Sequence, residues 1–432
     1  MANAYDIAYG AGLIIGSPVW LLRRKSRAKV MTALRERMGH VAPREGDELA
    51  VMIHAVSLGE MNATRALVQK LREARPGVRF IISTTTTTGF EQAKKLYGAA
   101  EDVKLIRYPL DFSSAIRRVL EGLRPSVVVL MELEVWPNFM KHCSARQIPV
   151  IVINARLTTS SFANYQRGLV VLKRMFRQLT RVCAQDETYG GRFKALGVPE
   201  DRITVTGTMK FDNAAVEDRV AGDEQLASEM GIKRESERVW VCGSTGPGEE
   251  EMVLGVYRRL VAKSVNLRLV IVPRHPERFD EVAQLIKTRG FRSMRRSKPQ
   301  MLEGNRVILG DTMGELRKWY SLADVVFVGR TLVDLGPRQH GSDMIEPAAL
   351  GKPVIVGPWT GNFAEVMNQF REGNAIIEVK SEQELERAVE RVLADDAELR
   401  GMGQRAQEIV RANQGATDRH VGVILELLGA RQ

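Results

Sequence analysis

Hydrophobic residues along the 432-residue chain occur in short runs, separated by longer segments in which apolar residues recur every three or four positions. The first series of runs is LAVMIHAVS, VRFIISTTTT, VKLIRYPL, SVVVLMEL, IPVIVINAR, RVCAQ and ITVTG, and the second is VWVCGS, LRLVIVP, RVILGD, DVVFVGR, PVIVGP and NAIIEV. Short apolar runs that alternate with amphipathic segments are typical of buried parallel strands joined by helices. The pattern therefore predicts an α/β fold with two doubly wound, Rossmann-like sheets.

A polar stretch between the two series predicts the domain boundary. The alternation lapses over residues 213–238, which we interpret as the interdomain linker. We expect one domain over residues 31–212 and a second over 239–432, the latter ending in periodic helices. Two such domains facing each other across a cleft would bind ligands at the carboxyl ends of their strands.

Residues 1–30 carry the one membrane signal. Residues 5–22 are mostly apolar, and the basic sequence RRKSRAK follows them at once. A signal peptide would carry its charges before the apolar stretch, so we expect an N-terminal membrane anchor, either interfacial or spanning. The alternative is an apolar helix that packs on the body of the protein.

Charge and cysteine content narrow the class of protein further. The formal net charge of +11 favours an anionic partner such as phospholipid, phosphorylated lipid or nucleic acid. Nucleic acid is not expected, because no zinc-finger spacing or aromatic and basic signature occurs. Cys143, Cys183 and Cys242 lie in apolar surroundings and predict buried thiols of a reducing compartment. The histidines show no metal-ligand spacing, so no metal site is expected.

The stretch HAVSLGEMNATRAL places Glu60 in the first turn of a predicted helix, directly after a predicted strand. The helix dipole alone favours an acidic residue there by roughly 0.3 to 1 kcal/mol. A purely structural role for Glu60 is therefore a plausible interpretation of its position.

Other polar side chains follow the predicted strands of the first domain. Glu132 and Glu134 in MELEVWPNF would share one face if their strand continued. Asn154 and Arg156 end the next strand, and Arg156 could hold a phosphate or pair with either carboxylate. The threonine run that includes Thr87 suits strands and helix caps.

In the second domain, the turn GSTGPGEEE over residues 243–251 is a candidate phosphate site, because backbone amides meet a helix N-terminus there. It lacks the Walker lysine and the G-x-G-x-x-G spacing, and a plain strand-to-helix turn is the alternative. Arg274 and His275 in VPRHPERF suit a phosphate or carboxylate, or else a solvated loop. Asp311 in GDTMGEL is interpreted as a helix cap, and Glu346 as a cap or a ribose ligand.

The motifs HAVSLGE, ELEVWPN, NARLT, TGTMKFD, GST…GEE, VPRHPERF, GDTMGEL, ADVVFVG and EPAALGKPVIVGP…NF resemble, in content and order, those of the Kdo transferases of lipopolysaccharide synthesis. The resemblance implies a GT-B glycosyltransferase that moves 3-deoxy-D-manno-octulosonic acid (Kdo) from CMP-Kdo to an anionic lipid A precursor (lipid IVA). It implies inverting single displacement, no metal or other cofactor, and a peripheral or single-pass protein of the inner membrane whose catalytic domains face the cytoplasm.

The same resemblance implies roles for particular residues. Glu60 would be the general base, in an acceptor-binding first domain. The residues implied in donor binding, mostly in the second domain, are Ser244, Thr245, Lys210, Arg274, His275, Asp311, Met313, Gly314, Glu346 and Asn362. Those implied in acceptor binding are Thr87, Glu134, Asn154 and Arg156.

The chain departs from the family pattern over residues 328–347, VGRTLVDLGPRQHGSDMIEP. The family usually has Gly-Gly-Ser and then Gly-Gly-His-Asn here, whereas this chain has Arg330 in place of a glycine and a longer loop before His340. We therefore expect altered donor contacts in this loop. Two alternatives remain open: a UDP-sugar-dependent GT-B transferase of envelope biosynthesis, and a non-catalytic membrane-surface binding protein.

Overall fold

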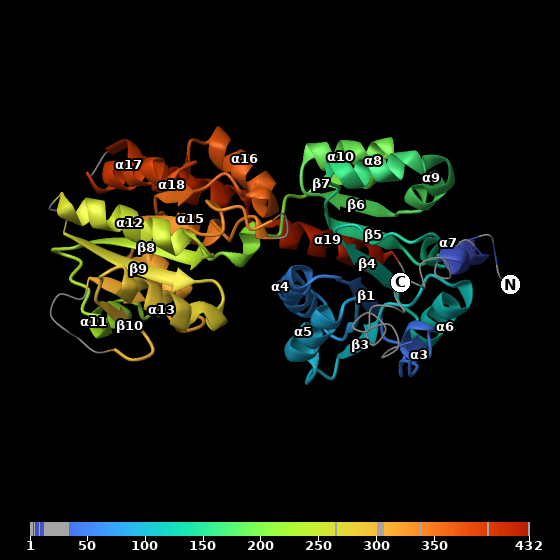
Figure 1. Cartoon of the computed structure of the whole chain (residues 1–432). Helices are drawn as coiled ribbons and strands as arrows, with labels where there is room; N and C mark the ends of the chain where they lie inside the picture. Colours follow the sequence, from blue (N-terminus) through green and yellow to red (C-terminus); the bar gives the residue numbers. More distant parts are fainter. Residues whose placement is uncertain are drawn as a thin grey trace. The chain divides into compact units, whose positions relative to one another are not determined.

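The computed structural model describes residues 3, 5–7, 9–12, 34–263, 266–299, 306–336, 339–394 and 397–430. The chain forms two compact units, unit 1 being Met1–Asn213 with Gln414–Gln432 and unit 2 being Ala214–Asn413 (Figure 1). Most of the expected membrane anchor, residues 13–22, lies outside the described residues. No helix among those that are described has the length and apolar character to cross a membrane.

Unit 1 is a parallel seven-stranded sheet with the strand order β3-β2-β1-β4-β5-β6-β7. Its strands are β1 (Ala50–His54), β2 (Arg79–Thr84), β3 (Val103–Arg107), β4 (Val127–Met131), β5 (Val150–Ala155), β6 (Arg181–Ala184) and β7 (Ile203–Val205). Its helices are α3 (Leu34–Arg37), α4 (Leu58–Ala74), α5 (Thr87–Tyr97), α6 (Ser113–Leu123), α7 (Pro137–Ala145), α8 (Thr159–Arg167), α9 (Leu169–Arg177), α10 (Glu187–Ala195), α19 (Ala416–Gly429) and the short 3-10 turns η1 (Glu200–Arg202) and η2 (Phe211–Asn213).

Unit 2 repeats this design with the strand order β10-β11-β9-β8-β12-β13-β14. Its strands are β8 (Arg238–Thr245), β9 (Leu267–Pro273), β10 (Ser293–Arg295), β11 (Val307–Leu309), β12 (Val325–Val328), β13 (Val354–Val356) and β14 (Ile377–Glu378). Its helices are α11 (Asp223–Glu229), α12 (Glu249–Ala262), α13 (Phe279–Thr288), α14 (Leu316–Leu322), α15 (Ile345–Ala349), α16 (Ala364–Glu372), α17 (Glu382–Leu393), α18 (Ala397–Asn413) and the 3-10 turns η3 (Pro276–Arg278) and η5 (Gly361–Phe363).

Helices cover both faces of each sheet, which explains the continuous apolar runs in the sequence. In β1, Val51 and Ile53 pack in a core with residues of α4, α5 and α19. Met52, on the opposite face, packs in a second core with residues of α6 and α7. The prediction of two parallel α/β domains is confirmed.

The C-terminal helix differs from the predicted domain organisation. α19 packs against α4 of unit 1, where Val421, Ile424 and Leu428 are buried, although residues 239–432 were all assigned to the second domain. The predicted linker, 213–238, also differs, because unit 2 begins at Ala214 and includes α11. Amphipathic periodicity identifies a helix but does not specify which unit its apolar face covers.

The described N-terminal residues are bound to unit 1 by polar contacts. The Asp6 carboxylate accepts hydrogen bonds from the Ser113 backbone NH at 2.7 Å and the Asn138 side-chain amide at 3.1 Å. Tyr9 packs edge-on against Phe112, with 5.1 Å between ring centroids. The described start of the expected anchor therefore packs on the body of unit 1.

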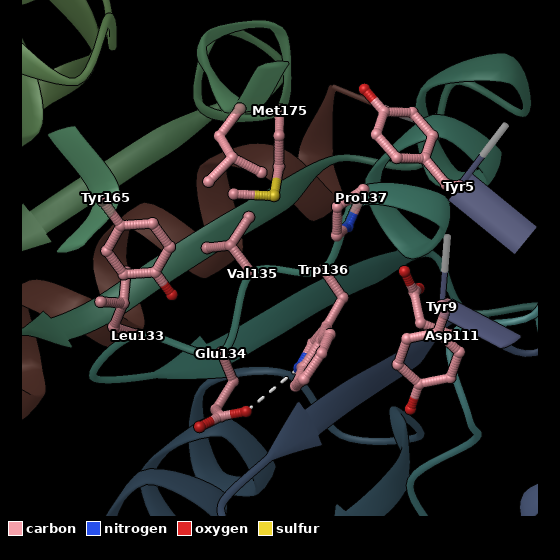
Figure 2. A pocket seen from close by; sticks show the side chains of 11 residues that line it. Tyr5, Tyr9, Asp111, Leu133, Glu134, Val135, Trp136, Pro137, Tyr165 and Met175 are labelled. Carbon is pink, nitrogen blue, oxygen red and sulfur yellow. Dashed lines mark hydrogen bonds between the residues drawn. The ribbon is translucent and has the colours of Figure 1, made fainter. Parts of the chain in front are cut away.

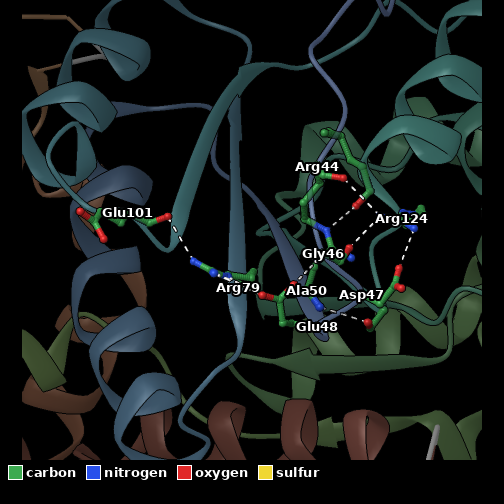
Figure 3. Close-up of polar contacts among 10 residues, drawn as sticks. Arg44, Gly46, Asp47, Glu48, Ala50, Arg79, Glu101 and Arg124 are labelled. Carbon is green, nitrogen blue, oxygen red and sulfur yellow. Dashed lines mark hydrogen bonds and ion pairs between the residues drawn. The ribbon is translucent and has the colours of Figure 1, made fainter.

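The strands' amino ends in unit 1 carry an exposed network of ion pairs (Figure 3). Arg124 donates to Asp47 at 2.8 Å and to the Gly46 carbonyl at 2.7 Å. Arg79 contacts Glu48 at 3.2 Å. Exposed pairs contribute about 0 to 1 kcal/mol each, and this network lies at the sheet edge opposite the carboxyl ends of the strands. We assign it a structural role.

Each sheet has a point where the strand order reverses, and this point locates the candidate site. In unit 1 it lies between β1 and β4, and in unit 2 between β8 and β12. Ligands of doubly wound sheets bind beyond the carboxyl ends of the strands at such points. The candidate functional residues therefore lie in the segments that follow β1, β4, β8 and β12.

Candidate functional site

Glu60 lies in the first turn of α4, directly after β1 at the strand-order reversal of unit 1. Its carboxylate accepts hydrogen bonds from the backbone NH groups of Val56 at 2.9 Å and Ser57 at 3.2 Å. The Ser57 hydroxyl in turn accepts from the Glu60 NH at 3.1 Å, which completes a capping box. The structural role expected from position is present, and the same bonds hold the half-buried carboxylate at the carboxyl edge of the sheet.

Glu134 follows β4 and lies near Glu60. Burial raises its pKa, the hydrogen bond from the Trp136 indole NH at 3.1 Å opposes this rise, and the Glu60 carboxylate adds to it. Glu132 and Glu134 would share a strand face only if the strand continued past them, and this condition is not met. β4 ends at Met131, and Glu132 has a left-handed backbone with φ of 57°, so the chain turns away from the strand there.

A largely apolar cavity of about 410 Å³ opens beside Glu134 (Figure 2). Side chains of the loop after β4 form one wall, residues of α8 and α9 form another, and the N-terminal segment closes a third. The lining residues are Tyr5, Tyr9, Asp111, Leu133, Glu134, Val135, Trp136, Pro137, Tyr165, Leu172 and Met175. No local pattern in the sequence predicts this cavity, because its lining residues come from segments that are far apart in the chain.

The threonine run mainly organises the backbone. The Thr86 hydroxyl donates to the Val56 carbonyl at 2.6 Å and accepts from the Gly89 NH at 3.1 Å, which caps α5. Thr87 is exposed on the first turn of that helix, at the carboxyl edge of β2. These bonds tie the start of α5 to the loop that leads to Glu60.

Asn154 has a structural role in unit 1. It lies in β5 with φ of 49°, and its side-chain oxygen accepts from the Met209 NH at 3.1 Å. Its carbonyl accepts from Gln185 at 2.9 Å. Asn154 therefore positions the segment around Lys210, which belongs to unit 1 although it was expected to contact the donor. Arg156 follows β5 and is partly buried at the same edge of the sheet.

The predicted phosphate turn follows β8 in unit 2. Ser244 has a left-handed backbone with φ of 56°, and its carbonyl accepts from the Ser342 hydroxyl at 3.4 Å. The Thr245 hydroxyl donates to buried Glu250 at 2.8 Å, and Glu250 forms a two-point ion pair with Arg278 at 2.6 and 3.1 Å. Glu250 thus fixes the turn through its hydrogen bond with Thr245 and its ion pair with Arg278. The sequence alone did not predict these interactions.

Arg274 brings the end of β9 to this turn, since its NH donates to the Thr245 carbonyl at 3.1 Å. Its neighbour His275 lies 3.7 Å from Glu277. Glu346, in α15, is close enough to Arg274 for the two charges to interact. Burial raises the pKa of Glu346 to about 7, the Asp343 carboxylate adds to the rise, and Arg317 and Arg274 oppose it.

The GDTMGEL segment divides into a structural part and an exposed part. Asp311 accepts hydrogen bonds from Arg295 at 2.6 Å and from the NH and hydroxyl of Ser297 at 2.8 and 2.6 Å. These bonds lower its pKa although burial acts in the opposite direction. Met313 is 66% exposed, and Gly314 has φ of 85°. Asp311 therefore anchors a turn that presents Met313 and Gly314 to solvent.

The divergent loop is organised by Glu249, a residue that sequence reasoning did not single out. Its fully buried carboxylate accepts from the backbone NH groups of Gly246 at 2.8 Å, Arg330 at 2.6 Å, and Thr331 and Leu332 at 2.9 Å each. Burial raises its pKa, and these four bonds oppose the rise. Glutamate is common in the first turn of a helix because it interacts favourably with the helix dipole. The sequence pattern therefore did not distinguish Glu249 from an ordinary first-turn residue.

The far end of the divergent loop packs on the segment before η5. Nε2 of His340 lies 2.8 Å from Oδ1 of Asp334, and its ring contacts the Trp359 ring in a tilted arrangement with 4.9 Å between centroids. Its carbonyl accepts from the NH of Asn362 at 3.1 Å, which places that expected donor residue beside the loop. Positions 337–338 lie outside the described residues. Across the part of the chain that is described, no group of three or more His, Cys, Asp or Glu side chains could hold a metal ion.

Comparison with known proteins agrees with this arrangement. The family model described as 3-deoxy-D-manno-octulosonic-acid transferase (kdotransferase) matches residues 32–213, and the model for glycosyl transferases group 1 matches residues 251–409. A glycosyltransferase from Rickettsia africae has a similar fold, with a TM-score of 0.56 at 14% identity over 89% of this chain and 99% of that chain. That similarity supports a GT-B fold.

Two relatives resemble the chain over most of their lengths. The 3-deoxy-D-manno-octulosonic acid transferase of Haemophilus influenzae is 36% identical over 380 residues, which cover 88% of this chain and 86% of that protein. The transferase of the same name from Bordetella pertussis is 34% identical over 426 residues, which cover 95% and 96%. The chain therefore belongs to the Kdo transferase family and is a glycosyltransferase of lipopolysaccharide biosynthesis.

Proposed function

We propose that this protein transfers Kdo from CMP-Kdo to a lipid A precursor, lipid IVA, by an inverting single displacement with Glu60 as the general base. The observation that carries the proposal is the place of Glu60: a carboxylate held by two backbone NH groups at the strand-order reversal of unit 1. General bases of this kind contribute about 10²- to 10⁴-fold to a rate.

In the proposed step, Glu60 takes the proton of an acceptor hydroxyl as its oxygen attacks the anomeric carbon of Kdo. The bond from that carbon to the phosphate oxygen breaks, and CMP leaves with the electron pair. Backbone NH groups of the turn after β8, together with Arg274, would stabilise the charge that develops on the departing phosphate. Metal is not part of the proposed step.

Two features of the protein support a lipid acceptor at a membrane surface. The apolar cavity beside Glu134 is of a size suited to a ligand and lies near the proposed base. The chain's net charge of +11 favours an anionic acceptor and the anionic surface of the inner membrane. Location at that membrane, with the catalytic units on the cytoplasmic side, is part of the proposal.

The donor half of the proposal predicts a pH-dependent affinity for CMP. If ionised Glu346 accepts hydrogen bonds from the ribose hydroxyls, nucleotide binding favours the carboxylate and lowers its pKa from the value of about 7 in the free protein. CMP affinity should then rise as the pH increases towards 7 and level off above it. Calorimetric titration of wild type and Glu346→Gln from pH 5.5 to 8.5 measures this dependence.

The Glu346→Gln variant is needed because the CMP phosphate itself titrates near neutral pH, with a pKa of about 6. That contribution is common to both proteins, so the difference between their profiles reports Glu346. Equal pH profiles would remove Glu346 from the nucleotide site. UDP should bind at least about tenfold more weakly than CMP, and a preference for UDP would instead favour a UDP-sugar transferase.

A further inference from the structure

Arg330 occupies a backbone conformation that favours glycine. It follows β12 at the strand-order reversal of unit 2 and has φ of 61°. A residue with a side chain is strained in this region, and such strain persists where the surrounding structure fixes it. Here the surrounding structure is the Glu249 carboxylate, which accepts from the Arg330 NH and from the NH groups of the next two residues.

The Arg330 side chain lies against the turn after β8. A Cβ atom added at Gly246 would be only 3.0 Å from Cγ of Arg330, and one added at Gly329 would be 2.5 Å from Cα of Thr245. The Arg330 Nε is buried and has no hydrogen-bond partner. A guanidinium is therefore fixed beside the backbone of the turn with donor capacity left over.

Arg274 reaches the same turn from the other side. The backbone NH of Arg274, directly after β9, donates to the Thr245 carbonyl. Arg274 therefore lies beside the turn after β8 that the Arg330 side chain contacts. The two guanidinium groups repel each other, and burial and this repulsion together lower the pKa of Arg330. Two cations converge at the carboxyl edge of β8, β9 and β12.

Neighbouring arginines form ion pairs with carboxylates, whereas, in the described part of the chain, Arg274 and Arg330 do not. Arg278 is paired with Glu250, and Arg295 with Asp311. Within the described ranges, no carboxylate forms an ion pair with Arg274 or Arg330. Glu249 lies near Arg330, but four backbone NH groups already engage its carboxylate. Glu346 is close enough to Arg274 for their charges to interact, but no ion pair joins them among the described residues. Two neighbouring guanidinium groups without a paired carboxylate suit an anionic ligand.

We propose that Arg330, together with Arg274, binds an anionic group of the donor at this turn, either the phosphate of the nucleotide or the carboxylate of the sugar. The identity of the donor rests on the proposed function, but the anion site does not, because any nucleotide carries a phosphate. Arg330 is then a specificity-determining residue of the donor site rather than part of a structural turn.

The test uses the full-length Arg330→Gly and Arg330→Lys variants. Glycine suits φ of 61°, so the melting temperature of Arg330→Gly should equal or exceed that of wild type, and lost affinity cannot then reflect unfolding. Calorimetric titration with CMP measures affinity for the nucleotide phosphate without the sugar. The KM for freshly generated CMP-Kdo measures the interaction with the intact donor. Lys287→Ala, which removes an exposed charge at the far end of α13, is the matched control.

Loss of a charge-assisted hydrogen bond should weaken binding by about 10- to 100-fold in Arg330→Gly, with a smaller loss in Arg330→Lys and none in Lys287→Ala. Weaker CMP binding assigns the phosphate. Unchanged CMP binding with a raised KM for CMP-Kdo assigns the sugar carboxylate. Unchanged values of both overturn the proposal.

Failure of the proposed function would look different. If wild type binds UDP in preference to CMP and does not turn over CMP-Kdo, the same variants are titrated with UDP, whose phosphates test the arginine pair equally well. Reduced UDP affinity in Arg330→Gly would then support the anion site while contradicting Kdo transfer from CMP-Kdo. Unchanged UDP affinity would contradict both.

Discussion

Replacing Glu60 with glutamine is expected to lower kcat for Kdo transfer by about 10²- to 10⁴-fold, because glutamine cannot accept the proton of the acceptor hydroxyl. The protein should remain folded. The glutamine oxygen can still accept one of the two backbone hydrogen bonds, from Val56 or Ser57, that the carboxylate now accepts. The cost in stability should be about 1 kcal/mol or less. Steady-state kinetics and thermal unfolding of the same preparation measure both effects.

Ser57→Ala separates the catalytic role of Glu60 from its structural role. It removes the other half of the same capping box, the hydroxyl that accepts from the Glu60 NH, and leaves the carboxylate in place. It should cost about 1 kcal/mol of stability but change kcat only a few-fold. If both variants lowered kcat equally, Glu60 would act as a helix cap and the general base would have to be sought elsewhere.

Of the substitutions proposed for this protein, replacing Glu249 with alanine should cause the largest decrease in the free energy of unfolding. Four backbone NH groups of the turn and the divergent loop would lose their acceptor in a buried site. Leaving a buried donor unsatisfied costs about 1 to 3 kcal/mol. Because water can replace the acceptor for some of the four donors, we expect a total on the order of 3 to 5 kcal/mol, as for removal of one partner from a buried charged network. For a unit of this size the melting temperature should fall by roughly 10 °C.

Glu251→Ala is the matched control for this prediction. Glu251 lies two residues further along α12, is exposed, and pairs with Arg289. Its removal should change the free energy of unfolding by less than about 0.5 kcal/mol, as expected for an exposed ion pair. Equal melting temperatures for Glu249→Ala and wild type would show that the four hydrogen bonds do not organise the loop.

The sequence predicted most of the fold because burial on both faces of a parallel sheet leaves a direct mark on the chain. Apolar runs such as SVVVLMEL and LRLVIVP correspond to β4 and β9. β10 was missed because its sequence, Ser-Met-Arg, has only Met294 buried. α19 was recognised as a helix and assigned to the wrong unit, since the buried surface of α4 that it covers is not encoded near it in the chain.

Residues of the candidate site could be predicted from the sequence only where a charged or polar side chain directly follows a predicted strand. Glu60 and Arg274 have this signature, and the structure places both at carboxyl edges of the sheets. Glu132 and Glu134 do not share a strand face because β4 ends at Met131 and Glu132 itself has a left-handed backbone. Glu249 and the cavity beside Glu134 depend on contacts between distant segments, which local spacing cannot reveal.

The central claim is best tested by measuring CMP release from freshly generated CMP-Kdo, with and without a tetraacylated lipid A precursor, for wild type and Glu60→Gln. We predict release that depends on the acceptor in wild type, with a lipid product heavier by one or more Kdo units in mass spectrometry, and almost none in Glu60→Gln. Folded wild type that releases no CMP in the presence of the acceptor, or Glu60→Gln that turns over at the wild-type rate, would contradict the account.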